Sequence, residues 1–118
     1  MILVDTSVWI DHFRRRNDRL VQLLTTSRVL VHPFVLGELA CGHLGKREEA
    51  LSMLRTLRPA PVAEHDEVLA MIERLKLFGT GLGYLDMHLI ASARLARRPI
   101  WSLDKPLAQV AFRLGVAG

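Results

Sequence analysis

The sequence begins MILVDTSVW (residues 1–9), and this stretch decides how the rest of the chain is interpreted. Its apolar run ends at Val4 and is followed at once by a carboxylate, Asp5, and by two hydroxyl residues, Thr6 and Ser7. A short, continuous apolar run is typical of a strand that is buried on both faces. The stretch therefore predicts a core strand over residues 2–4 that ends on an acid.

The rest of the chain alternates short apolar segments with amphipathic ones. Strands are predicted at 29–31 and 100–103, with a brief extended segment near Val62 and an edge strand within 115–118. Helices are predicted from a Ser7 cap through Phe13, from Asn17 or Asp18 through Leu24, and over 33–41, 46–57, 66–78, 84–97 and 106–114, with a break at 58–61 and a loop at 79–83. This alternation indicates an α/β fold in which helices cover both faces of a central parallel sheet of four to five short strands. We expect a single domain over residues 1–118.

Composition favours a folded intracellular protein. Half of the 118 residues are hydrophobic and 24% are charged, which argues against disorder. The single cysteine, Cys41, has no internal disulfide partner, as is usual in a reducing compartment. The apolar start lacks the basic flank of a signal peptide, and no run approaches the roughly 18 apolar residues of a membrane span. We therefore expect a cytoplasmic location and no membrane partner.

Four acids stand at positions where an α/β fold builds its ligand site. Asp5 and Asp104 follow predicted strands, while Glu38 and Asp86 interrupt apolar helical segments. Ligands in such folds bind beyond the carboxyl ends of the strands. Each acid also has an ordinary interpretation, because Asp86 and Asp104 can cap helices and Glu38 can face solvent.

A cluster of these acids requires a positive charge to neutralise it. A divalent cation is the simplest candidate, and oxygen ligands favour Mg²⁺ or Mn²⁺ over Zn²⁺, with one or two ions. The chain carries a net charge of +4, and without the four acids its basic excess rises to +8. An acidic metal pocket on a basic protein suits a phosphodiester substrate.

At these residues the chain resembles the PIN-domain ribonucleases, and more narrowly the VapC-type toxins of type II (VapBC) toxin–antitoxin systems. The resemblance rests on LVDTSVW (3–9), LGEL (36–39), GYLDMHLIA (83–91) and WSLDK (101–105), which occur in the order of the family. It implies a Mg²⁺- or Mn²⁺-dependent endoribonuclease that leaves a 3′-hydroxyl and a 5′-phosphate. By this similarity the catalytic and metal-binding acids are Asp5, Glu38, Asp86 and Asp104, and the supporting hydroxyls are Thr6, Ser7 and Ser102.

The resemblance also implies partners. A small VapB-type antitoxin is expected to cover the acidic groove, with an arginine reaching the carboxylates. A homodimer or a toxin–antitoxin hetero-oligomer is expected as well. The apolar helices predicted at 17–25 and 33–41 suit such an interface and suit an ordinary core equally.

Basic residues provide the candidates for RNA contact. They are Arg14, Arg15, Arg16, Arg94, Arg97, Arg98 and Lys105, each of which also suits an ordinary solvated surface. Trp9 and Trp101 have apolar neighbours, which favour core packing over stacking on bases. For His88 we expect a role in helix packing or at the surface rather than in catalysis.

Two other functions remain open at this point. A Mg²⁺-dependent phosphatase with Asp5 as its nucleophile usually has a second aspartate two residues later, and here that residue is Ser7. A non-catalytic PIN-like module that binds RNA or protein would be marked by the loss of an acid, and all four are present.

Overall fold

The computed structural model describes residues 1–118 and contains one sheet of four parallel strands. In the sheet the strands are ordered β3-β2-β1-β4, so the first strand of the chain lies inside the sheet. Leu3 pairs with Leu30 on one side and with Ile100 on the other. The strands are β1 (Ile2–Val4), β2 (Val29–Val31), β3 (Arg58–Pro59) and β4 (Ile100–Trp101).

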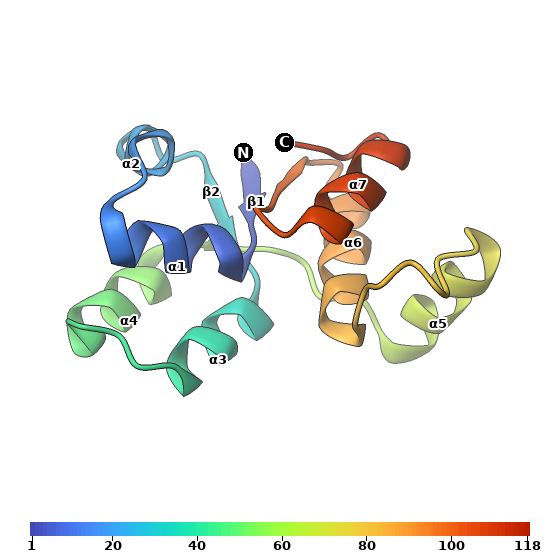
Figure 1. Ribbon diagram of the computed structural model, residues 1–118, viewed down its shortest axis with the longest axis horizontal. Helices are drawn as coiled ribbons and strands as arrows, with labels where there is room; N and C mark the ends of the chain where they lie inside the picture. The colour runs from blue at the N-terminus through green and yellow to red at the C-terminus, as the bar shows by residue number, and fades with distance from the viewer.

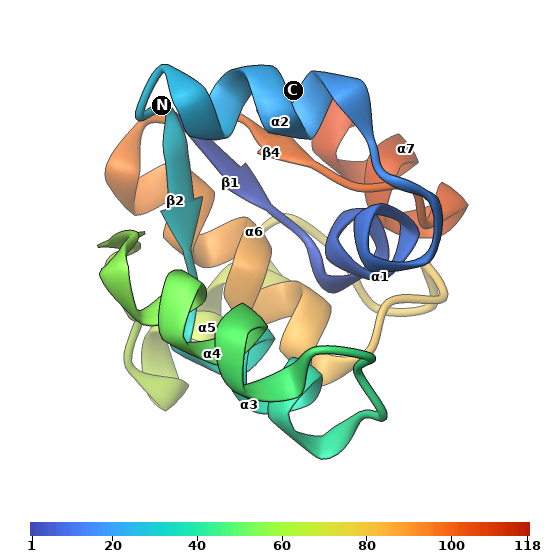
Figure 2. The same cartoon turned by 90° about the vertical axis from the view of Figure 1, so that its left-hand side faces the viewer.

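Seven helices cover the two faces of the sheet, as the sequence predicts. Figure 1 shows the first four helices on one side of the strands and the last three on the other. Figure 2, turned by 90°, shows β2, β1 and β4 side by side with α6 behind them. The helices are α1 (Thr6–Arg15), α2 (Asp18–Thr25), α3 (Pro33–Cys41), α4 (Arg47–Thr56), α5 (His65–Arg74), α6 (Tyr84–Ala96) and α7 (Lys105–Arg113). None of them is long and apolar enough to cross a membrane.

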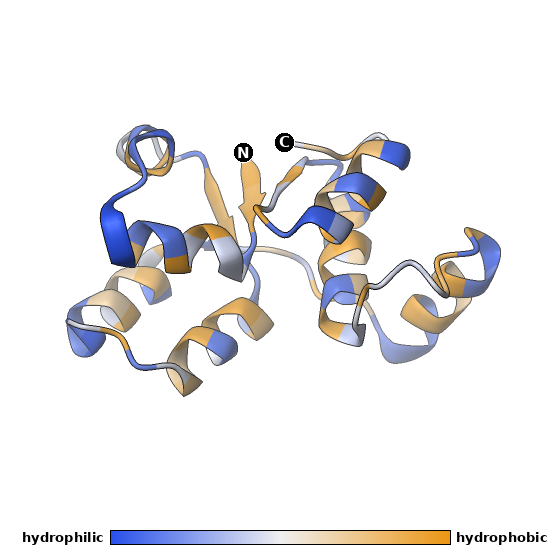
Figure 3. Cartoon of the chain, in the orientation of Figure 1, coloured by the Kyte–Doolittle hydropathy of each residue, from blue (hydrophilic) through white to orange (hydrophobic).

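The core is built around β1, whose residues are all buried. The two inner strands β1 and β2 are uniformly hydrophobic in Figure 3, as expected for strands covered on both faces. Trp9 is fully buried and stacks on Phe13, with ring centroids 5.9 Å apart. Trp101 is buried too, and Arg19 lies 4.2 Å over its ring. Both tryptophans therefore belong to the core, as their apolar neighbours predict.

Several predicted bounds are wrong. The break at 58–61 contains the strand β3, because its backbone pairs with β2 and Ala60 N–H donates to Val31 C=O, whereas the segment near Val62 forms no strand. Pro59 is tolerated there because β3 is an edge strand. The helix predicted over 66–78 begins at His65 and ends at Arg74, and Lys76 has a positive φ of 55° that a helix cannot continue through.

The last strand and the C-terminal segment are shorter than predicted. β4 ends at Trp101 instead of residue 103, because Ser102 turns into the connection to α7. The segment 115–118 contributes a single parallel bridge, between Ala117 and Ile100, rather than a full edge strand.

The residues that follow the strands also begin the helices. Asp5 follows β1 directly and caps α1, which corrects the predicted Ser7 cap. His32 follows β2 and caps α3, and Asp104 caps α7 shortly after β4. In each case a side-chain acceptor binds a free backbone N–H of the first helical turn. The strand-to-helix connections are therefore short, and the side chains in them stay at the carboxyl edge of the sheet.

The core packing predicts that replacing two leucines by alanine has different effects on the free energy of unfolding. Leu54 of α4 is fully buried, whereas Leu95 of α6 is 51% exposed. Leu54→Ala is expected to lower the free energy of unfolding by about 2–5 kcal/mol, because it removes apolar contacts and leaves a cavity. Leu95→Ala is the control and should change it by about 0.5 kcal/mol or less. Urea unfolding measures both, and equal effects would contradict the assignment of Leu54 to the core.

Candidate active site

The four predicted acids share the carboxyl edge of the sheet. Asp5 follows β1, Asp104 follows the turn after β4, Glu38 lies on α3 and Asp86 in the first turn of α6. Burial raises the pKa of Asp86, and the negative charges of Asp5, Asp104 and Glu38 raise it further, while the Gly83 N–H opposes them. The carboxylates of Asp5, Glu38 and Asp104 therefore all lie within electrostatic reach of Asp86.

Asp5 is the centre of the hydrogen-bond network. Its carboxylate is buried, and Oδ2 accepts hydrogen bonds from Ser7 Oγ at 2.6 Å and from Ser102 Oγ at 2.8 Å. The two hydroxyls in turn accept bonds from the backbone N–H groups of Leu103 and Asp104, at 2.9 and 3.0 Å. One carboxylate thus joins the start of α1 to the turn between β4 and α7.

Each of the other three acids is held through one oxygen as well. Thr6 Oγ1 donates to Glu38 Oε1 at 2.7 Å, which links α1 to α3. Gly83 N–H donates to Asp86 Oδ2 at 3.0 Å, and Leu107 N–H donates to Asp104 Oδ2 at 3.2 Å. The second oxygen of each of the four carboxylates accepts no hydrogen bond from the chain.

No basic side chain neutralises this group. The three ion pairs of the structure use Asp11, Asp18 and Glu48 instead. Carboxylates with free oxygens and no cationic neighbour are the donor set that a hard divalent cation prefers. With the side chains where they stand, no three acidic or histidine residues converge into a metal site. Binding of such an ion therefore requires side-chain adjustment or ligation through water.

Two buried histidines lie beside the start of α3. His32 Nδ1 accepts the Phe34 N–H at 3.0 Å, so His32 fixes where the helix that carries Glu38 begins. Burial, and to a smaller extent the neighbouring His88, lowers the pKa of His32 to about 4. His88 is buried and packs edge-on against Phe34 and Tyr84, with ring centroids 4.8 and 4.7 Å away. His88 therefore has the packing role that we expected.

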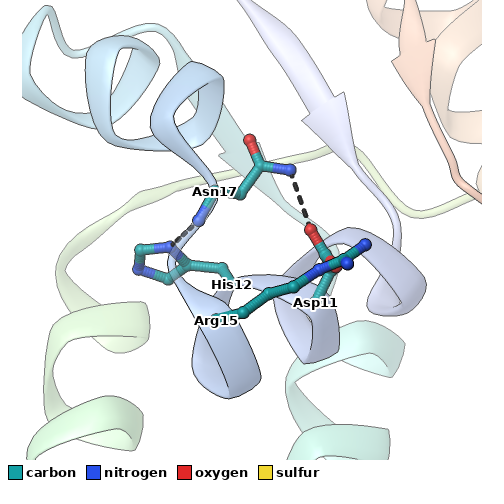
Figure 4. A network of polar contacts seen from close by, with 4 residues as sticks. All are labelled: Asp11, His12, Arg15 and Asn17. Carbon is teal, nitrogen blue, oxygen red and sulfur yellow. Dashed lines mark hydrogen bonds and ion pairs between the residues drawn. The ribbon is translucent and has the colours of Figure 1, made fainter.

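Two of the predicted RNA ligands at the end of α1, Arg15 and the C-cap residue Arg16, are engaged within the chain. Arg15 Nε binds Asp11 Oδ1 at 2.6 Å, and Asn17 Nδ2 binds the other oxygen of Asp11 at 3.1 Å (Figure 4). These two hydrogen bonds lower the pKa of Asp11. Arg16 Nε lies 3.2 Å from Asp18 Oδ1. Arg14 is exposed and has no acidic partner.

Of the remaining basic candidates, Arg94 of α6 lines a hollow between α5 and α6, and the other three lie at two different ends of the sheet. Lys105 is exposed and follows Asp104 directly, so it lies at the edge that carries the acids. Arg97 and Arg98 precede β4, and Arg98 lines a hollow with Met1 and Arg58 at the amino end of the strands. The structure therefore does not bring Arg97 and Arg98 together with the acids, and their contact with RNA stays a prediction.

Sequence reasoning missed two backbone groups at the site. Gly83 N–H holds Asp86, and Leu103 N–H holds Ser7. Asp86 stands three residues after the N-cap residue Gly83, a spacing at which an acid of the first turn can accept the N-cap N–H, so this contact was readable from the sequence. Leu103 and Ser7 are 96 residues apart in the sequence, and no local pattern predicts their contact.

Comparison with known proteins agrees with this geometry. The PIN domain family model matches residues 2–113, so the chain belongs to the PIN-domain family. Within the family it is related to VapC-type ribonucleases. It is 44% identical to Ribonuclease VapC32 of two Mycobacterium tuberculosis strains, over 99% of this chain and 95% of the relative.

A solved structure supports the fold alone. The structure described as FitAB bound to an IR36 DNA fragment matches with a TM-score of 0.59 at 20% sequence identity, over 99% of this chain and 92% of the other. The predicted α/β architecture is thereby confirmed.

The lowered pKa of His32 predicts that the protein loses stability in mild acid. The folded chain keeps His32 neutral down to about pH 4, whereas the unfolded chain takes up a proton near pH 6.5. The free energy of unfolding should therefore fall as the pH drops from about 6.5 to 4, by up to roughly 3 kcal/mol. Urea unfolding at several pH values measures this slope.

A pair of variants isolates this contribution. His32→Asn keeps a capping side chain and should flatten the slope, although the parts due to His88 and His12, whose pKa values burial also lowers, remain. His43→Asn, at an exposed histidine, should keep the full slope. Equal slopes in the two variants would show that His32 is not the group responsible.

Proposed function

We propose that this chain is the toxin of a toxin–antitoxin pair and acts as a metal-dependent endoribonuclease that hydrolyses RNA phosphodiester bonds. The observation that carries the proposal is the group of four carboxylates without a cationic partner at the carboxyl edge of a PIN-domain sheet. The relatives that are 44% identical are named as ribonucleases, and the net charge of +4 favours a polyanionic substrate.

Asp5 and Asp86 are proposed as the main ligands of Mg²⁺ or Mn²⁺, with Glu38 and Asp104 binding directly or through water. The donor set supports this assignment, since each acid keeps one oxygen free of hydrogen bonds from the chain. When bound, such an ion acidifies water and stabilises the negative charge that develops on the phosphate.

The chain itself contributes positioning. Ser7 and Ser102 fix the carboxylate of Asp5, and Thr6 fixes that of Glu38, so both acids are oriented before the substrate arrives. Water then attacks phosphorus and the bond from phosphorus to the 3′ oxygen breaks. The products are a 3′-hydroxyl and a 5′-phosphate. Lys105, next to Asp104, is a candidate to bind a phosphate of the same strand.

The proposed partner is a small antitoxin of the VapB type that covers the acids. An arginine from such a partner would neutralise the same carboxylates that bind the metal, and it can do so with two parallel hydrogen bonds. The antitoxin would thereby compete with both the ion and the RNA. A second copy of the chain, alone or within a hetero-oligomer with antitoxin, completes the proposed assembly.

The nuclease proposal is tested with antitoxin-free protein, a mixed RNA pool, and Mn²⁺, Mg²⁺ or a chelator. Cutting should require the ion, and Asp5→Asn should slow it more than the roughly 10- to 100-fold that loss of an outer-shell group costs. Asp66→Asn removes an exposed acid of α5 and should cut like the wild type. Folded, metal-loaded protein that cuts no RNA, or cutting that persists in chelator, would contradict the proposal.

Metal binding is tested separately, through stability. Mn²⁺ at about 100 times its dissociation constant should raise the free energy of unfolding of the wild type by about 2.7 kcal/mol. Asp86→Asn should lose most of this gain. In chelator at pH 7 it should be at least as stable as the wild type, because burial and the neighbouring charges, which raise the pKa of Asp86, disfavour its ionised form. Equal stabilisation of both proteins by Mn²⁺ would rule out Asp86 as a ligand.

A further inference from the structure

The basic run Arg14-Arg15-Arg16 at the end of α1 leaves one unpaired guanidinium. Arg15 is held by Asp11 and Arg16 by Asp18, whereas Arg14 is exposed and has no acidic partner. The run is therefore not a uniform basic patch. Its free positive charge is concentrated at Arg14.

Arg14 borders two neighbouring hollows, both of which also include Ile10 of α1. The first has a volume of about 240 Å³ and lies between α1 and the loop from α3 to α4. It is lined by Ile10, Phe13, Arg14, Glu38, Leu39, Gly42, His43, Leu44 and Gly45. The second includes Ser7 and Leu103, which belong to the network around Asp5. Both hollows thus connect Arg14 with residues of the acidic site.

We propose that the hollow between α1 and the α3–α4 loop is a nucleotide subsite in which Arg14 binds an RNA phosphate adjacent to the scissile one. This inference rests on the proposed ribonuclease function and names a contact of its substrate. Eight residues of helix separate Thr6 from Arg14, a rise of about 12 Å. Because Arg14 lies at the opposite end of α1 from Asp5, we assign to it a neighbouring phosphate instead of the scissile one.

The chemistry of the hollow suits a single-stranded nucleotide. Its lining includes the half-buried Phe13 and Leu44, which can accept the apolar face of a base or a ribose, and the exposed Arg14 and His43, which can donate to phosphate oxygens. A base that packs on Phe13 or Leu44 must be unstacked, so we infer that the strand is single-stranded where it crosses the hollow.

Continuity with the acids favours RNA over a peptide as the occupant. A strand whose scissile phosphate lies at the four carboxylates must place its neighbouring nucleotides in the hollows beside them. The hollow is lined both by Glu38, which belongs to the acidic site, and by Arg14, and the two form no ion pair with each other. A phosphate can pair with Arg14, while the proposed cation neutralises Glu38.

The test compares Arg14→Gln with Arg74→Gln. Arg74 is likewise exposed, lies in the last turn of its helix and has no acidic partner, but it lines a separate hollow between α5 and α6. Both variants carry the same net charge. Arg14→Gln is expected to raise KM for RNA roughly tenfold and to leave kcat within about twofold, because the contact exists in both the ground state and the transition state. Arg74→Gln should change neither.

Binding provides a second readout that needs no cutting. RNA affinity is measured against salt concentration in chelator, with Asp5→Asn present in every protein. Removing one phosphate contact should lower the slope of log affinity against log salt by about 0.7 for single-stranded RNA. Arg14→Gln should show this decrease, and Arg74→Gln should keep the full slope. Unfolding curves of each variant confirm that the folded state is intact.

The outcomes separate the two proposals. If Arg14→Gln matches Arg74→Gln in KM and in salt slope, the nucleotide subsite is refuted, even if Arg14→Gln alters inhibition by an antitoxin. If Arg14→Gln lowers kcat and leaves KM and the salt slope unchanged, the subsite is refuted as well. If the protein that retains Arg14 shows a larger salt slope than Arg14→Gln, but the wild type never cuts RNA, the nuclease function is refuted and the Arg14 contact stands.

Discussion

The buried carboxylate of Asp5 is the interaction on which the rest of the site depends. It ends the inner strand β1, caps α1, and accepts hydroxyl hydrogen bonds from Ser7 and Ser102. A carboxylate is costly to bury unless several donors satisfy it, and here those donors come from segments almost one hundred residues apart. The pairing of β4 with β1 and the orientation of the Asp5 side chain are therefore coupled. A chain that misplaces the β4–α7 turn also loses the alignment of its first acid.

The hydrogen bonds of Asp5 stabilise the site, whereas the negative charges of the remaining acids destabilise it. Four carboxylates at one edge of the sheet repel one another, and this repulsion adds to the burial that chiefly raises the pKa of Asp86. The fold tolerates it because one oxygen of each acid is bound by a backbone N–H or a hydroxyl. Without a cation, the four carboxylates destabilise the folded chain, and a bound cation stabilises it. In the proposed function that cation is either the metal or an arginine of the antitoxin, so the same charge cluster serves catalysis and inhibition.

Sequence alone predicted the features that depend on local pattern. Short apolar runs located β1 and β2, and acids next to apolar segments marked the edge where Asp5, Glu38, Asp86 and Asp104 lie. Sequence reasoning failed where the structure depends on contacts between residues that are far apart in the chain. β3 forms because β2 offers it a partner, and Ser7 binds Asp5 and Leu103 instead of capping α1. The pairing of Arg15 with Asp11 was likewise hidden, although the spacing of four residues within one helix permits it.

Both borders of the sheet are unfavourable for the addition of a further strand. At the β3 border Pro59 has no N–H to offer, and a strand added there would lack one of its ladder bonds. At the other border Ile100 exchanges backbone hydrogen bonds with Val116 and Gly118, so the C-terminal segment occupies the groups that a new strand would use. β-Augmentation, in which a partner extends the sheet with its own backbone, is thus disfavoured on either side. Recognition of this domain through side chains of its helices and loops is correspondingly favoured.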